Sequence, residues 1–230
     1  MAEVNENADE FWLFGYGSLI WKPPPHFDRR IPGWVTGYVR RFWQDHRGTP
    51  EAPGRVVTLI ERSFWSSLVD AHASAPDKVW GVAYRIDPAH VAEVKDYLDI
   101  REINGYTIHY TPFHPADGSS DIRTLVYIGT PDNDQFTGPQ EPQALAEHIW
   151  RSEGPSGRNR DYLLGLEKAL DELSPESGDE HVTDLSNRLR EIEAKDNKGE
   201  ANGVEEPIPP PSHEFRKVSS VEEQEETEKA

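Results

Sequence analysis

Apolar residues in this chain gather in six short runs with the length and composition of β-strands. The runs are rich in aromatic and β-branched residues and are bounded by Gly, Pro, Asn and Asp, as strands separated by turns are. We predict strands over residues 11–14, 34–43, 55–61, 79–85, 106–113 and 122–129. Turn-prone residues predict loops at 47–54, 66–78 and 129–142. Three consecutive prolines predict an extended connector over 22–32, because proline fits neither a helix nor a central strand.

A helical repeat replaces the strand pattern at four places. Asp87 and Pro88 form an N-cap followed by proline at the first helical position, and apolar residues then recur at 91, 94 and 98. This helix is expected to reach about residue 102, because Asn104 and Gly105 supply a stop signal. Amphipathic spacing predicts three further helices over 143–153, 158–173 and 179–195.

Glu102 has an unusual place in this pattern, at the end of the first helix and just before a strand. At about 100° per residue it projects close to Val91, so its carboxylate points along the buried stripe, whereas Glu93 projects to the opposite face. Burial and the negative end of the helix dipole both raise the pKa of a carboxyl group, which suits a general base. The alternative is that the helix frays earlier and Glu102 is solvated or paired with an arginine.

Two glycine-rich turns are candidates for binding. Gly15 and Gly17 follow the first strand, and successive N–H groups in such a turn can hold a carboxylate or a phosphate, although a plain β-turn is the commoner use. Residues 154–159 form a second turn. It either brings Ser156, Asn159 and Tyr162 to one rim or simply connects two helices.

Composition narrows the class of protein. Of the 230 residues, 35% are hydrophobic, and the net charge of −18 argues against nucleic acid or an anionic membrane as partner. The absence of cysteine excludes disulfides and a thiol nucleophile and fits a reducing compartment. Neither a signal peptide nor a membrane-length apolar run is present, so we expect a cytoplasmic protein.

The expected organisation is a flexible N-terminus (1–10), one domain (11–195) and a tail (196–230). The tail has ten acidic residues against four basic ones and few apolar residues, which predicts disorder.

Several kinds of chemistry lack their motifs here. The chain has no P-loop, no Gly-x-Ser-x-Gly and no His-Glu-x-x-His, and the glycine pair at 15 and 17 lacks the third glycine of a dinucleotide fingerprint. His109 and His114 are five residues apart on a strand and should face opposite ways, which argues against a metal site. Arg40 and Arg41 are expected to be structural ion-pair partners.

An ordered series of motifs resembles the ChaC-type glutathione-specific γ-glutamylcyclotransferases over residues 11 to about 190. The motifs are Phe14-Gly-Tyr-Gly-Ser-Leu-Ile-Trp21, Arg41-Phe-Trp-Gln44, Asp45-His-Arg-Gly-Thr-Pro50, Pro53-Gly-Arg-Val-Val-Thr-Leu59, Val79-Trp-Gly-Val-Ala-Tyr84, Tyr97-Leu-Asp-Ile-Arg-Glu-Ile-Asn-Gly-Tyr106, Val126-Tyr-Ile-Gly-Thr130 and Gly154-Pro-Ser-Gly-Arg-Asn159. Gln44 adjoins Asp45 directly, whereas the family often has extra small residues between them, which bears on substrate preference.

The resemblance implies a small α+β fold around a mixed, barrel-like sheet with flanking helices. It also implies cleavage of glutathione to 5-oxoproline and cysteinylglycine without a cofactor or a metal. The γ-glutamyl group would lie on the loop Gly15, Tyr16, Gly17, Ser18, Leu19 and Ile20, with Tyr162 as a further candidate contact, and Glu102 would be the catalytic acid and base. Two alternatives are the same chemistry on other γ-glutamyl compounds and a non-catalytic protein that binds γ-glutamyl peptides.

Overall fold

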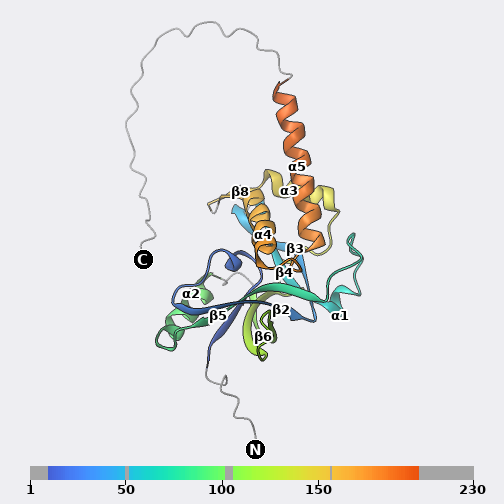
Figure 1. The fold of residues 1–230 in the computed structure, drawn as a ribbon. Coiled ribbons are helices and arrows are strands. Elements are labelled where there is room, and N and C mark those ends of the chain that lie inside the picture. Colours follow the sequence, from blue (N-terminus) through green and yellow to red (C-terminus); the bar gives the residue numbers. More distant parts are fainter. Residues whose placement is uncertain (1–9, 50–51, 102–105, 156, 202–230) are drawn as a thin grey trace, which may run out of the picture.

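Five strands form a closed barrel in the computed structural model (Figure 1), which describes residues 10–49, 52–101, 106–155 and 157–201. In order around the barrel, they are β1 (Trp12–Gly15), β5 (Lys78–Ile86), β2 (Phe27–Thr36), β6 (Tyr106–Pro115) and β7 (Ile122–Gly129). Aromatic and β-branched side chains are frequent in these strands, and β1, β5 and β7 are buried along most of their length. Phe14 and Phe113 meet with their ring centroids 5.6 Å apart.

The pairing of β1 with β7 closes the barrel and is its one parallel contact among the described strands. Leu13 lies opposite Leu125 in this pair, so β1 and β7 end at the same rim of the barrel. Strand β6 runs antiparallel to β7 and begins at that rim, with Tyr106 opposite Gly129. We call this end, where β1 and β7 finish and β6 starts, the Gly15 rim.

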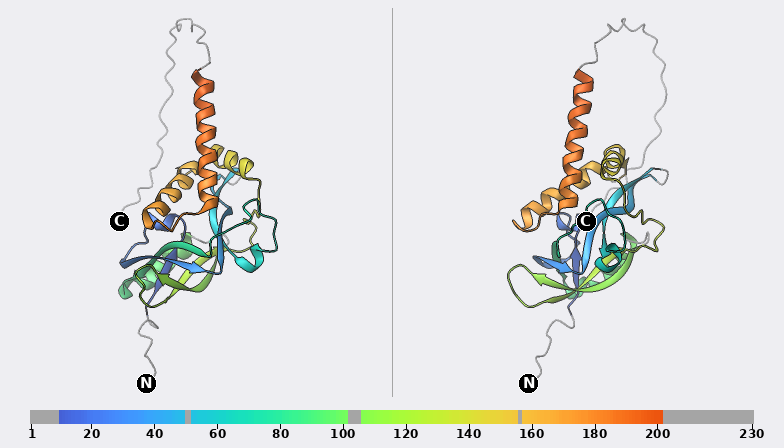
Figure 2. Two further views of the ribbon diagram at one scale, coloured as in Figure 1. Left: turned by 45° about the vertical axis from the view of Figure 1, so that its right-hand side comes forward. Right: turned by 90° about the vertical axis from the view of Figure 1, so that its right-hand side faces the viewer.

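A second layer is built from a hairpin and three helices (Figure 1). The hairpin consists of β3 (Tyr38–Thr49) and β4 (Ala52–Glu61), and the helices are α3 (Pro142–Arg151), α4 (Asn159–Leu173) and α5 (Glu180–Ala201). Figure 2 shows that the C-terminal part of α5 extends away from the rest of the fold. Buried leucines on α4 and α5 hold the layer together, including Leu163, Leu166, Leu185 and Leu189.

Short elements complete the chain. They are η1 (Ser18–Ile20), α1 (Arg62–Trp65), η2 (Pro88–His90), α2 (Val91–Arg101) and the strand pair β8 (Glu153–Gly154) and β9 (Gly157–Arg158). Helix α2 buries Val94 and Leu98 completely, as its apolar spacing predicted. The side chain of Asp87 caps η2, which leads directly into α2, by accepting from the amide of Ala89.

The predicted connector over residues 22–32 is wrong in its second half, because β2 begins at Phe27. Pro32 lies within this strand, opposite Val82 of β5. The pairing of β2 with β6 covers only residues 33–35, so Pro32 lies at the end of that ladder, where its carbonyl accepts from the amide of Ala116 at 2.9 Å and a residue without an N–H group is tolerated. The predicted strand 34–43 is two strands, separated by Gly37 with a φ of 82°.

The predicted fold class, α+β around a barrel-like sheet with flanking helices, is confirmed. Strand 122–129 has the predicted bounds, and apart from the strand predicted over 34–43, the other strands and helices lie near theirs. Helix α5 continues to Ala201, past the predicted domain end at residue 195. Residues 1–9 of the proposed flexible N-terminus and 202–230 of the acidic tail lie outside the described residues, whereas Glu10 is described and pairs with Arg85 at 2.7 Å. None of the described helices has the length and apolarity needed to cross a membrane.

Candidate functional site

The turn after β1 is folded tightly upon itself at the Gly15 rim, and both of its glycines are needed for space. A Cβ atom on Gly15 would lie 2.5 Å from Cβ of Leu19, and one on Gly17 would lie 2.9 Å from the hydroxyl of Tyr162 and 3.0 Å from Cγ2 of Val57. Neither glycine has a positive φ. The close approach of Leu19, Tyr162 and Val57 leaves no room for a side chain at these two positions.

Hydroxyl and guanidinium groups from the barrel hold this turn by its carbonyl oxygens. The Tyr84 hydroxyl donates to the carbonyl of Leu19 at 2.8 Å, and Arg30 donates to the carbonyl of Ile20 at 3.4 Å. The Tyr16 hydroxyl is buried and donates to the carbonyl of Tyr127 on β7 at 2.8 Å. The side chain of Tyr16 therefore fixes the turn to the barrel.

The amide groups of the turn divide into two sets. Those of Ile20, Trp21 and Lys22 donate to the carbonyls of Gly17 and Ser18 at 2.8–3.1 Å and form the η1 turn. The amides of Gly17 and Leu19 have no hydrogen-bond acceptor within the described part of the chain. Free N–H groups in a tight turn form a donor cluster that suits a carboxylate or an oxyanion.

Tyr162 on α4 lies beside this turn, as the sequence suggested. Its ring is buried between Trp21 and Phe42, with centroids 5.7 Å and 5.9 Å away, and its hydroxyl faces Gly17. The other two residues of the predicted rim are Ser156 and Asn159. Ser156 lies outside the described residues, and both polar atoms of the Asn159 side chain bond the backbone of Arg55 on β4, each at 2.7 Å. Asn159 therefore has a structural role.

A buried positive charge lies close to the turn. Arg40 on β3 is fully buried, donates to the carbonyl of Trp80 and pairs with Asp179 at 3.4 Å. Burial lowers the pKa of the Arg40 guanidinium, and the charge of Asp179 opposes that shift; the side chains of Tyr162 and Tyr16 are also within electrostatic reach of Arg40. An arginine keeps its proton even so, and Arg40 is therefore a buried cation beside the turn, paired with Asp179.

The prediction that Arg40 and Arg41 are ion-pair partners is confirmed. Arg41 donates from Nε to Asp70 at 2.6 Å, and both side chains are at most 5% exposed. Residue type alone did not reveal that Arg40 is also close to the glycine turn, because its two phenol neighbours come from distant parts of the chain.

A buried histidine pair adjoins these arginines. The Phe42 amide donates to Nε2 of His181 at 3.1 Å, which assigns the proton of His181 to Nδ1, facing His72 at 3.1 Å. His72 then donates from Nε2 to Asp184 at 3.0 Å. Burial, the charge of Arg41 and His72 together hold the pKa of His181 well below its usual value. His181 is thus neutral and joins β3 to α5.

Glu102 and the stop signal at Asn104 and Gly105 lie outside the described residues. Their flanks are described, with α2 ending at Arg101 and β6 starting at Tyr106 on the Gly15 rim. The strand that follows residues 102–105 therefore starts at the rim where the glycine turn lies. His109 and His114 make separate contacts, to Thr107 and Asp121.

The barrel and its rim turn define the chain as a protein with the γ-glutamylcyclotransferase-like fold. A yeast γ-glutamylcyclotransferase specific to glutathione has the same fold, with a TM-score of 0.71 and 38% identity over 79% of this chain and 96% of the yeast chain.

The family model described as ChaC-like protein matches residues 11–192, and the chain belongs to this family. It is 45% identical to the glutathione-specific γ-glutamylcyclotransferase of Schizosaccharomyces pombe, covering 78% of this chain and 92% of the relative. It is 42% identical to the Saccharomyces cerevisiae enzyme of the same name, covering 74% and 89%. An Arabidopsis thaliana protein named γ-glutamylcyclotransferase 2-3 is 40% identical, covering 79% and 89%.

Proposed function

We propose that this protein converts glutathione to 5-oxoproline and cysteinylglycine. The similarity to enzymes named for this activity, at 38–45% identity over about three quarters of the chain, is the observation that carries the proposal. The lack of cysteine fits a reducing compartment such as the cytoplasm, where thiols stay reduced.

The reaction needs few protein groups because the substrate supplies its own nucleophile. The α-amine of the γ-glutamyl group attacks the γ-carbonyl carbon and forms the carbon–nitrogen bond of a five-membered lactam. The bond from that carbon to the cysteine nitrogen breaks, and one proton moves from the attacking nitrogen to the leaving nitrogen. A positioned base that returns the proton as an acid satisfies this balance.

The glycine turn suits the task of folding the substrate into attack geometry. The amides of Gly17 and Leu19 would bind the α-carboxylate or the oxyanion that forms at the γ-carbonyl, and the buried cation Arg40 would favour either negative group. Orientation of this kind contributes up to about 7–11 kcal/mol, and each oxyanion donor about 3 kcal/mol. The turn acts through its backbone, so its side chains matter mainly for its shape.

Glu102 is the group that we assign to proton transfer. The strand that follows its segment, β6, starts at Tyr106 on the Gly15 rim, and this supports the assignment. The substrate amine is mostly protonated near pH 7, so a carboxylate must first accept a proton from it.

Product analysis with two substrates tests the function. The purified protein should release 5-oxoproline and cysteinylglycine in equal amounts from reduced glutathione and turn over γ-glutamylalanine far more slowly. Comparable rates on both would favour a general γ-glutamyl cyclotransferase. Glutathione binding without either product would favour a non-catalytic binding protein.

A further inference from the structure

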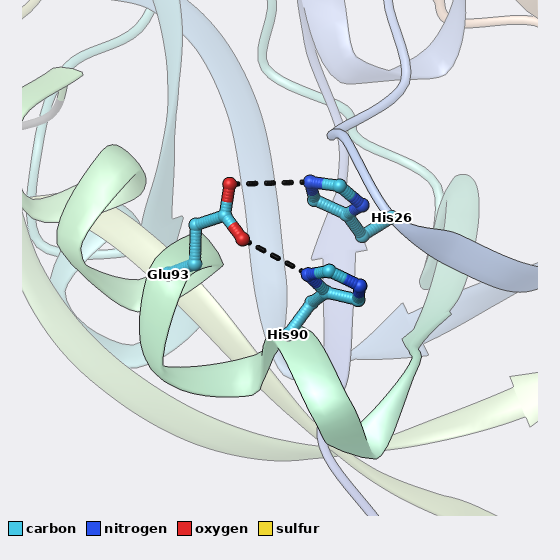
Figure 3. Close-up of side chains that lie close together, drawn as sticks. All are labelled: His26, His90 and Glu93. Carbon is cyan, nitrogen blue, oxygen red and sulfur yellow. Dashed lines mark hydrogen bonds and ion pairs between the residues drawn. The ribbon is translucent and has the colours of Figure 1, made fainter.

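A cluster of two histidines and one glutamate joins the connector before β2 to the first turn of α2 (Figure 3). His26 Nε2 lies 3.3 Å from one carboxylate oxygen of Glu93, and His90 Nδ1 lies 2.9 Å from the other. All three ligand atoms are within 4.8 Å of one another, a combination found at one place among the described residues. His26 comes six residues after Ile20 of the glycine turn (26 minus 20) and Glu93 nine residues before Glu102 (102 minus 93), and none of the three residues has a role in the chemistry above.

Two of the three separations within the cluster match those of a metal site. In a tetrahedral site with bonds of about 2.0–2.1 Å, neighbouring ligand atoms are about 3.3 Å apart. The two observed histidine–glutamate separations, 3.3 Å and 2.9 Å, are near that value before any ion draws the groups together. The shared hydrogen bonds already aim both imidazoles at one carboxylate, so a cation would replace two bridging protons.

One adjustment is needed for binding. The rings of His26 and His90 are stacked, with centroids 3.9 Å apart and an angle of 4° between their planes. A metal ion lies in the plane of each imidazole that ligates it, so one ring must rotate out of the stack. Their side chains are 36% and 39% exposed, which leaves room for that rotation and a path for an ion from solvent.

The kind of ligand decides the kind of metal. Imidazole nitrogens favour zinc, copper or nickel, whereas magnesium and calcium require mostly oxygen ligands. Two histidines and one glutamate with an open fourth position form a common zinc arrangement.

We propose that His26, His90 and Glu93 bind one zinc ion, with water in the remaining position. The ion would fasten the connector before β2 to the start of α2, where the amide of Asp87 already donates to the carbonyl of His26 at 2.9 Å. An ion that binds only the folded chain raises its stability by mass action, so zinc should raise the unfolding temperature.

Zinc titration of the untagged full-length chain against a chromophoric chelator tests the site. The wild type should bind one zinc ion that H26A and H90A bind roughly tenfold or more weakly, since even loss of a residue that only supports a metal ligand costs 10–100-fold. Cobalt should give the intense visible absorption of a four-coordinate ion in the wild type alone. Zinc should raise the unfolding temperature of the wild type more than that of H26A.

H114A is the matched control, because His114 also pairs with a carboxylate, Asp121, at 2.8 Å on an exposed surface. It should bind zinc as the wild type does. Equal zinc affinity in the wild type, H26A and H90A would overturn the proposal, as would an equal loss in H114A. Unfolding curves without metal show that each variant is folded before its affinity is compared.

Discussion

Replacing Gly17 by alanine probes the glycine turn most directly, because the structure fixes what the added methyl group meets. Its Cβ would lie 2.9 Å from the Tyr162 hydroxyl and 3.0 Å from Cγ2 of Val57, whereas ordinary contact begins at 3.4 Å. The first contact is thus 0.5 Å too short (3.4 minus 2.9). Tyr162 is wedged between Trp21 and Phe42 and cannot retreat freely, so the turn must move instead.

The expected cost follows from that displacement. Misplacing reacting groups by 1 Å can reduce a rate about 100-fold, so a shift of about half that distance should lower kcat/KM for glutathione roughly tenfold. Overpacking a tight site should also reduce the free energy of unfolding by about 1–3 kcal/mol. Product release and urea unfolding, measured on the same preparation of G17A, give both values.

Two further variants make the prediction specific. Y162F removes the oxygen that forms the shorter contact, so G17A should cost less stability in the Y162F background, with a coupling of about 0.5–1 kcal/mol. G165A is the control within α4, because its Cβ would meet Trp21 at an ordinary 3.5 Å and alanine favours the helix. Wild-type kcat/KM and stability in G17A would refute the role of the turn.

Three other changes have definite expected outcomes. E102Q should keep the unfolding midpoint but lower the release of cysteinylglycine about 100-fold or more, because the amide cannot take up the amine proton; near-normal release would remove Glu102 from the mechanism. The pKa of His181 is depressed in the folded state, so below about pH 6.5 the unfolded chain binds a proton that the folded chain does not bind. The free energy of unfolding should therefore fall by up to about 1.4 kcal/mol per pH unit. Urea unfolding at pH 7.5 and 5.0 should show a smaller loss of stability in H181N than in the wild type, and equal losses would contradict this. D70N breaks the buried pair with Arg41 and should lower the free energy of unfolding, measured in urea, by about 3–5 kcal/mol. K168A removes an exposed pair and should lower it by under about 1 kcal/mol. Similar small losses in both variants would contradict a stabilising role for the buried pair.

Periodicity predicted those parts of the fold in which one local signal dominates. Strand 122–129 has a continuous apolar run, and the spacing of Val94 and Leu98 correctly marked the buried face of α2. The start of β2 was missed because prolines at 23–25 and 32 argue against a strand. Only the tertiary pairing shows that Pro32 is opposite Val82 of β5 and lies outside the ladder between β2 and β6. The break at Gly37 was hidden because apolar and aromatic residues continue on both sides of it.

The sequence predicted which segment of the chain forms the candidate site, but not which residues of other elements contact it. The glycine turn was identified from Gly15 and Gly17, although the physical reason for these glycines is crowding by Leu19, Val57 and Tyr162. Those neighbours come from other elements, and local sequence carries no signal for them. The hydrophobic periodicity of the sequence likewise does not predict the parallel pairing of β1 with β7.

That parallel pairing makes barrel closure and catalysis interdependent. The turn that would grip the substrate leaves the barrel with β1, and the segment with the proposed acid enters it with β6, which β7 holds in place. Separating β1 from β7 would leave each strand with an antiparallel neighbour and much of its secondary structure, yet would draw the two halves of the reaction centre apart. When β1 separates from β7, enzyme turnover should therefore be lost before circular dichroism shows a loss of secondary structure.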